Sequence, residues 1–129
     1  MAQLTDPSFT IRIDPPRKYV EICLLGMWDE ATAKRFDQEL RRLLPALPKG
    51  GCPIGEQNTL FDSTGYAVQA QDVSTHLAGM AADTSIGSRR IAVLVSSALS
   101  KLQTRRIAPG YGVFSDRAEA MAWLFEPDA

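Results

Sequence analysis

The chain has 129 residues, the size of one domain, and 45% of them are hydrophobic, so it can bury a sizeable core. Its 14 basic and 15 acidic side chains leave a formal net charge of −1, without the positive excess that drives binding to nucleic acid phosphates. No apolar run approaches the ~20 residues that span a bilayer, and residues 1–7 lack the basic and apolar regions of a secretory signal. We therefore expect one domain over residues 1–129, cytoplasmic, with no nucleic acid partner and no stable membrane anchor.

The first predicted elements are two strands. Apolar and polar residues alternate over residues 9–13, the period-two pattern of a half-buried strand. Residues 14–18 contain two prolines and form a turn, and residues 19–25 form a second strand with its apolar side chains on one face. Because the connection is so short, these two strands are expected to pair antiparallel.

Helices and strands alternate after this pair. Asp29 is a good N-cap for a helix whose apolar residues recur at helical spacing until Pro45. A loop rich in glycine and proline follows, and residues 58–62 form a third, short strand. The next helix has Asp72 as its best N-cap, and Gly87 lies just past its end.

The last third of the chain has the clearest pattern. Residues 90–96 are almost continuously apolar, as expected of a strand that is buried on both faces. A short helical run then stops at Pro109, and residues 111–114 form a strand. Asp116 and Glu119 have the spacing of a capping box, which opens a final helix.

The predicted order of elements is β-β-α-β-α-β-α-β-α. Alternation of strands and helices implies right-handed crossovers and parallel neighbours in the sheet. We therefore expect an α/β fold in a single domain, with a mainly parallel five-stranded sheet and four helices. The first strand is expected to lie antiparallel at the edge.

Two arginine pairs stand at the ends of predicted elements. Arg89 and Arg90 precede the central strand, and Arg105 and Arg106 end the third helix, where cations suit the helix dipole. If the two ends lie on the same side of the sheet, they form a small basic patch for an acidic partner or a lipid head group. Alternatively, they are charged ends solvated by water.

Three passages between elements occur together in this order: residues 26–29, residues 90–95 with 99–106, and residues 113–116 with 119–124. With this order the chain resembles the SpoIIAA-like branch of the STAS superfamily, roughly over residues 9–124. That superfamily contains the anti-sigma factor antagonists and overlaps with Sec14-like lipid carriers. The resemblance implies a bacterial, non-catalytic regulatory or protein-interaction module whose partner is another protein.

In the anti-sigma factor antagonists, an Asp-Ser-Ser-Gly motif lies where the third strand leads into the second helix, and its second serine is phosphorylated. Residues 62–65 match this motif in letters, and residues 72–75 match it in position. The resemblance thus makes Ser63, Thr64 and Ser74 candidate phosphoacceptors. The alternative is that the first segment is a turn and that Asp72 is an ordinary N-cap.

No residues have the spacing of a catalytic or metal site. His76 is the only histidine, whereas a nucleophile usually needs a base within hydrogen-bond reach and a metal needs three or four ligands. The glycine-rich residues 50–55 lack the Lys-Ser/Thr ending of a phosphate-binding loop. Cys23 and Cys52 are too few for a disulfide framework, although one disulfide between them stays possible. We expect neither an enzyme nor a cofactor.

A carrier or sensor of a small lipophilic ligand is the alternative function, because related SpoIIAA-like and Sec14-like folds use the space between helices and sheet as a pocket. Met27, Trp28, Phe36 and Met80 are the candidate lining residues, although such residues at helical spacing are also typical of a core.

A homodimer is a further possible assembly. Three large side chains near the end of the chain are candidates for its interface: Tyr111, Trp123 and Phe125.

Overall fold

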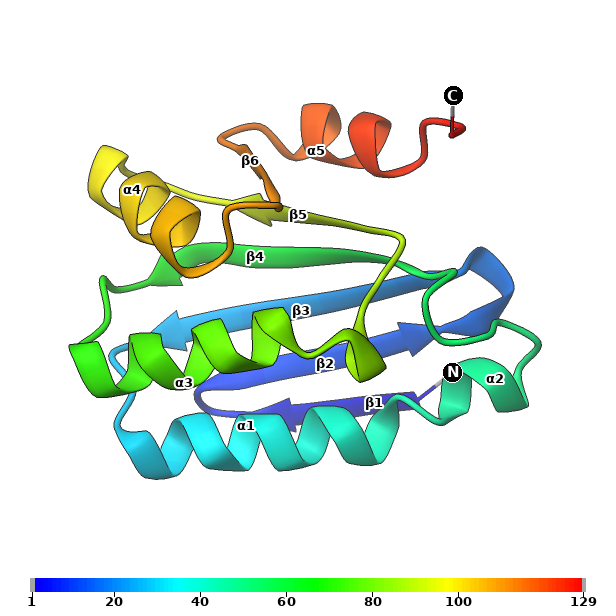
Figure 1. The fold of residues 1–129 in the computed structure, drawn as a ribbon, viewed down its shortest axis with the longest axis horizontal. Helices are drawn as coiled ribbons and strands as arrows, with labels where there is room; N and C mark the ends of the chain where they lie inside the picture. Colours follow the sequence, from blue (N-terminus) through cyan, green and yellow to red (C-terminus); the bar gives the residue numbers. More distant parts are fainter. Residues whose placement is uncertain (1, 129) are drawn as a thin grey trace.

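In the computed structural model, which describes residues 2–128, six strands form one mixed sheet in the order β1-β2-β3-β4-β5-β6 (Figure 1). The β1–β2 and β2–β3 pairs are antiparallel, and the remaining pairs are parallel. The strands are β1 (Ala2–Asp6), β2 (Phe9–Asp14), β3 (Tyr19–Gly26), β4 (Asn58–Tyr66), β5 (Arg90–Leu94) and β6 (Gly112–Phe114).

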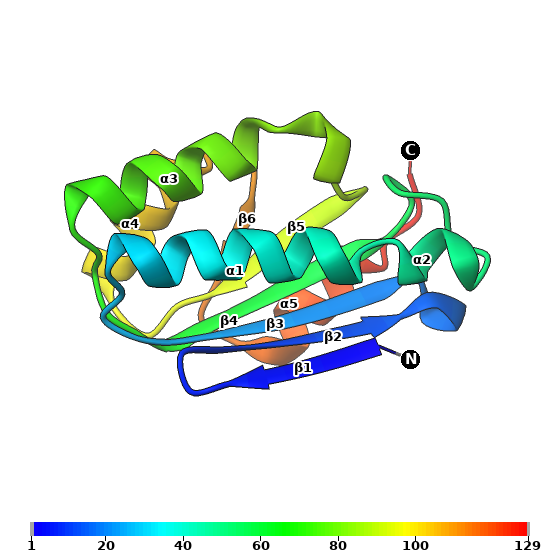
Figure 2. The same cartoon turned by 90° about the horizontal axis from the view of Figure 1, so that it is seen from below.

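Helices cover both faces of the sheet. Figures 1 and 2 show α1, α3 and α4 on one face and α5 on the other. The helices are α1 (Glu30–Leu43), the single turn α2 (Ala46–Lys49), α3 (Gln71–Ala82), α4 (Ala98–Ile107) and α5 (Arg117–Leu124). The α/β class, the element order from β2 onward and the four longer helices are therefore confirmed.

The predicted number of five strands is wrong, because β1 precedes the first predicted strand. β1 has one large apolar residue, Leu4, which pairs with Ile11 of β2. Its side chains alternate between half-buried and exposed, so the pattern is too weak to identify a strand without its partner. The antiparallel edge strand is consequently β1, and β2 lies inside the sheet.

The caps of α1 and α5 form as predicted. The Asp29 carboxylate accepts a hydrogen bond from the backbone N–H of Thr32 at 2.8 Å, and Asp116 accepts one from Glu119 at 3.0 Å. Each bond satisfies an amide that has no partner within its helix. The buried face of α1 is made by Ala33, Phe36, Leu40 and Leu43.

Two details around β4 differ from the prediction. The strand continues past Asp62 to Tyr66, because its second half pairs with the end of β3, where Gly26 lies opposite Tyr66. In addition, the N-cap of α3 is Ala70 instead of Asp72, whose carboxylate accepts from the N–H of the adjacent Val73. Residues 62–65 therefore belong to a strand and not to a turn.

The apolar side chains form one core on each face of the sheet. The larger core lies under α1 and α3 and includes Phe9, Ile22 and Phe36. The smaller core lies under α5 and includes Leu60 and Leu124. This double coverage explains the continuous apolar pattern of β5.

Candidate functional site

A cavity of about 140 Å³ lies between the sheet and the helices α1, α3 and α4. Its walls are mostly apolar and come from β3, β4 and β5 on one side and the three helices on the other. Representative lining residues are Ile22, Phe36, Leu40, Phe61, Met80 and Val93. A mostly apolar cavity with a few polar groups in its wall has the general character of a small-molecule site.

Tyr66, at the end of β4, brings an unpaired polar group to this cavity. Its hydroxyl is buried and has no hydrogen-bond partner among residues 2–128. Burial raises the pKa of Tyr66, so the phenol is neutral and able to donate a hydrogen bond. A buried polar group without a partner is costly, which makes Tyr66 a candidate contact for a bound polar atom.

The polar side chains at the opposite end of the cavity already bind one another. Gln57 Nε2 donates to the carbonyl of Gly87 at 3.1 Å, and Gln57 Oε1 accepts from the N–H of Gly55 at 2.7 Å. The hydroxyls of Thr59 and Ser88 lie 2.7 Å apart. These groups therefore form hydrogen bonds within the protein and do not need a ligand to satisfy them.

Two glutamines join the loops beside Tyr66 to α4. Gln69, which is 6% exposed, accepts from the N–H of Trp28 at 2.8 Å and donates to the carbonyl of Ala67 at 2.6 Å. Gln103 accepts from the N–H of Gln69 at 2.9 Å and donates to the Ser74 hydroxyl at 3.1 Å. This Gln69–Gln103 pair fixes the β3–α1 loop, the β4–α3 loop and α4 relative to one another.

Of the four residues predicted to line a pocket, the structure brings only Phe36 and Met80 to the cavity. Met27 is 64% exposed in the β3–α1 loop. Trp28 is buried, and its ring packs on Phe9, Phe36 and Tyr66. Trp28 supports the wall from behind without being part of the lining.

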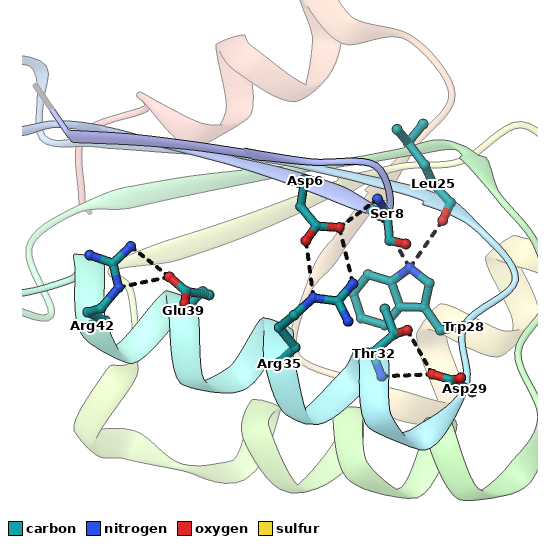
Figure 3. A network of polar contacts seen from close by, with 9 residues as sticks. All are labelled: Asp6, Ser8, Leu25, Trp28, Asp29, Thr32, Arg35, Glu39 and Arg42. Carbon is teal, nitrogen blue, oxygen red and sulfur yellow. Dashed lines mark hydrogen bonds and ion pairs between the residues drawn. The ribbon is translucent and has the colours of Figure 1, made fainter.

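Figure 3 shows how the same region is held to the edge of the sheet. The Trp28 indole N–H donates to the carbonyls of Ser8 and Leu25 at 3.2 and 3.1 Å. Arg35 of α1 pairs with Asp6 of β1, with Nε 3.1 Å from the carboxylate. This ion pair lowers the pKa of Asp6 through the Arg35 hydrogen bond and ties the edge strand to α1.

The three predicted phosphoacceptors lie in different environments. Ser63 is 6% exposed and lines the cavity, so the residue as a whole is buried. Thr64 is exposed on β4, and its hydroxyl donates to Asp62 at 2.6 Å. Ser74 is the fourth residue of α3 and is half-buried, with its hydroxyl accepting from Gln103. Only Ser74 lies near a helix N-terminus.

The candidate catalytic and redox residues are also separate from the cavity. His76 Nε2 lies 3.1 Å from the carboxylate of Asp37, and neither residue is part of the lining. Among residues 2–128, no three His, Cys, Asp or Glu side chains gather as metal ligands. Cys23 and Cys52 are free thiols, so the possible disulfide is not formed.

The residues proposed for a dimer interface mostly pack within the chain. Tyr111 stacks on Phe61 with ring centroids 6.4 Å apart, and Trp123 packs on Phe114 at 5.6 Å. Phe125 is 42% exposed. The homodimer stays a prediction, with Phe125 as its most accessible side chain.

Of the two arginine pairs in the predicted basic patch, only the second pair is exposed. Arg89 and Arg90 hold the C-terminal segment, with Arg89 donating to the Leu124 carbonyl at 2.9 Å and Arg90 to that of Trp123 at 2.6 Å. Arg105 and Arg106 are exposed. The basic surface available to a partner therefore lies on α4.

Comparison with known proteins identifies the fold. No protein-family model and no curated protein matches the sequence. A crystal structure of an uncharacterized protein of the DUF3478 family with a SpoIIAA-like fold, from Shewanella loihica PV-4, is similar with a TM-score of 0.67. The match has 18% sequence identity and covers 91% of this chain and 94% of that chain. The fold is SpoIIAA-like. The predicted resemblance is thus confirmed for the fold, which many unrelated functions can share.

Proposed function

We propose that this SpoIIAA-like protein is a non-catalytic binder of a small lipophilic molecule, which occupies the cavity between sheet and helices. The observation that carries the proposal is the buried Tyr66 hydroxyl without a partner beside an apolar cavity. A ligand with one hydrogen-bond acceptor would satisfy this hydroxyl and fill the space. Neither His76 nor Asp37 is part of the cavity lining, which is consistent with a role without catalysis.

The volume of the cavity indicates the size of the group that it can hold. An apolar cavity of roughly 150 Å³ in a protein core holds a molecule the size of benzene, and the cavity here measures about 140 Å³. The pocket is open to solvent on part of its boundary, so the group that it holds is an aromatic or short alkyl body with a carbonyl-type acceptor. Phe36, Phe61 and Met80 would contact the apolar body, with the flexible Met side chain adapting to its shape.

Two probes of matched size test the role of Tyr66. Acetophenone carries a carbonyl acceptor, and ethylbenzene has none. We expect Tyr66→Phe to weaken acetophenone binding about fivefold, which corresponds to the ~1 kcal/mol of one hydrogen bond. Ethylbenzene binding should change by less than about twofold. Titration calorimetry measures both. Equal losses for the two probes, or no binding of either by the wild type, would contradict the proposal.

A second pair of variants tests the location. Met80→Trp fills the cavity and should abolish binding of both probes, whereas Met27→Trp changes an exposed residue outside the lining and should leave it intact.

Without ligand, Tyr66→Phe should be as stable as the wild type or more stable by about 1 kcal/mol, because it removes an unpaired buried hydroxyl. A marked destabilisation of that variant would show that the hydroxyl has a partner.

A protein-interaction module regulated by phosphorylation is the second candidate function, and the position of Ser74 favours it. A phosphoryl group there would add nearly two negative charges within the first residues of α3, where the helix dipole stabilises an anion. It would also stand beside Gln103, which connects α3 to α4. Phosphorylation would then act on the contact between two helices that line the cavity.

A further inference from the structure

Helix α4 presents two large apolar side chains to solvent, together with three cationic ones. The α4 side chains that line the cavity are Ser100, Gln103, Thr104 and Ile107. Outside the cavity lining, Leu99 is 68% exposed and Leu102 is 59% exposed. No residue from Ala98 to Ile107 is fully buried. A surface helix normally turns its large apolar residues toward the core, so the two exposed leucines of α4 are suited to contact with another apolar surface.

Exposed apolar residues from neighbouring loops lie at the same end of the molecule. Met27 in the β3–α1 loop is 64% exposed, and Val68 in the β4–α3 loop is 42% exposed. Both loops and the start of α4 lie where β3, β4 and β5 end (Figure 1), and the hydrogen bonds between Gln69 and Gln103 hold α4 to the β4–α3 loop. Apolar residues grouped in this way usually mark an interaction surface.

The charges of α4 identify the kind of surface that it fits. Lys101, Arg105 and Arg106 are exposed around Leu99 and Leu102, and the helix contains no acidic residue. Helices that lie in a membrane interface combine exposed leucines with Lys and Arg side chains, and the cations meet anionic head groups. A protein partner would instead have to supply an acidic groove shaped to this helix.

We propose that α4 docks reversibly on an anionic phospholipid surface, with Leu99 and Leu102 inserted at the boundary between head groups and acyl chains. Lys101, Arg105 and Arg106 then lie among the lipid phosphates. No helix among residues 2–128 is long and apolar enough to cross a bilayer. The proposal rests on the outer side of α4 and requires no ligand in the cavity, so it can fail independently of the proposed function.

Sedimentation of the full chain with lipid vesicles tests this proposal. We expect binding to vesicles of phosphatidylcholine with 30% phosphatidylglycerol, weakening with added salt as head-group attraction is screened, and much weaker binding to pure phosphatidylcholine. Leu99→Ser with Leu102→Ser should reduce the partition coefficient about tenfold or more. Replacing Lys101, Arg105 and Arg106 by glutamine should remove the preference for the anionic vesicles.

The controls separate lipid binding from folding and from the cavity. Ile54→Ser with Phe125→Ser changes two exposed apolar residues outside α4 and should bind vesicles like the wild type. The Leu99 and Leu102 variant should keep the wild-type melting temperature and still bind acetophenone, and Met80→Trp should still bind vesicles. Absence of binding to anionic vesicles by the wild type, or binding that survives the loss of both leucines, overturns the proposal. A protein that binds α4 when vesicles do not would also overturn it.

Discussion

The three candidate phosphoacceptors, Ser63, Thr64 and Ser74, differ in their surroundings, and these decide which of them suits a phosphoryl group. Ser63 is a buried residue, the Thr64 hydroxyl donates to Asp62, and the Ser74 hydroxyl accepts from Gln103. A phosphoryl group on Thr64 would face a carboxylate and be repelled, whereas one on Ser74 would meet an amide donor and a helix N-terminus. Ser74 is therefore the preferred acceptor at the scale of single residues.

Ser74→Asp tests this preference. We expect the variant to fold and to change the set of proteins captured from a lysate, because it places a negative charge beside the α3–α4 contact. Ser74→Ala is the uncharged control and should lose about 1 kcal/mol of stability with the Gln103 hydrogen bond. Thr64→Asp is the matched control at the other acceptor. Identical capture profiles for wild type, Ser74→Asp and Thr64→Asp would remove the switch hypothesis.

At the scale of elements, charged side chains connect α1 to the end of α3. Arg41 of α1 contacts Asp37 at 2.6 Å and Asp83 at 2.9 Å. The Ser85 hydroxyl and N–H, together with Arg41, lower the pKa of Asp83 to about 2. An aspartate in the unfolded chain titrates near 3.9. The folded state therefore binds this proton more weakly than the unfolded state does.

This difference predicts a contribution of Asp83 to acid stability. The contribution is complete above about pH 4 and is lost as the pH falls toward about 2, since protonation then favours the unfolded chain. Asp83→Asn should flatten the decline of the melting temperature over this range. Glu30→Gln, an exposed carboxylate elsewhere on α1, is the control and should retain the wild-type slope. Parallel curves for wild type and Asp83→Asn would contradict the assignment.

At the scale of the whole molecule, one arginine joins the last helix and the C-terminal segment to the sheet. Arg89, just before β5, donates to Asn58 Oδ1 at 3.0 Å and to the Leu124 carbonyl at 2.9 Å, and pairs with Asp128 at 2.9 Å. Its side chain is only 21% exposed. The smaller core under α5 is thus closed by contacts between residues far apart in the chain.

Loss of this arginine should destabilise the whole fold. We expect Arg89→Met to reduce the free energy of unfolding by about 2 kcal/mol, because hydrogen bonds to a charged, half-buried donor are lost. Arg42→Met removes a 60% exposed guanidinium paired with Glu39 of the same helix, and should cost less than about 0.5 kcal/mol. Urea unfolding measures both. Equal stabilities for the two variants would show that the Arg89 contacts add no more to the stability of the fold than an exposed ion pair does.

The sequence predicts the elements that have strong local patterns. It does not predict an element whose formation depends on pairing with another segment. The caps at Asp29 and Asp116 and the buried face of α1 follow from residues a few positions apart. β1 is missed because it gains its identity only by pairing with β2. In the same way, Phe36 and Met80 are predicted as pocket residues, but Tyr66 is not. No local pattern shows that its hydroxyl will be buried without a hydrogen-bond partner.

The sequence by itself determines the α/β class and the order of elements from β2 to α5, because hydrophobic periodicity and helix capping act between near neighbours. Only the tertiary structure decides which polar groups are left without a partner and which side of α4 faces outward. Both depend on distant segments. β4 reaches Tyr66 by pairing with β3, and Gln103 turns inward to bind Gln69. The cavity and the exposed leucines of α4 are consequences of these long-range contacts.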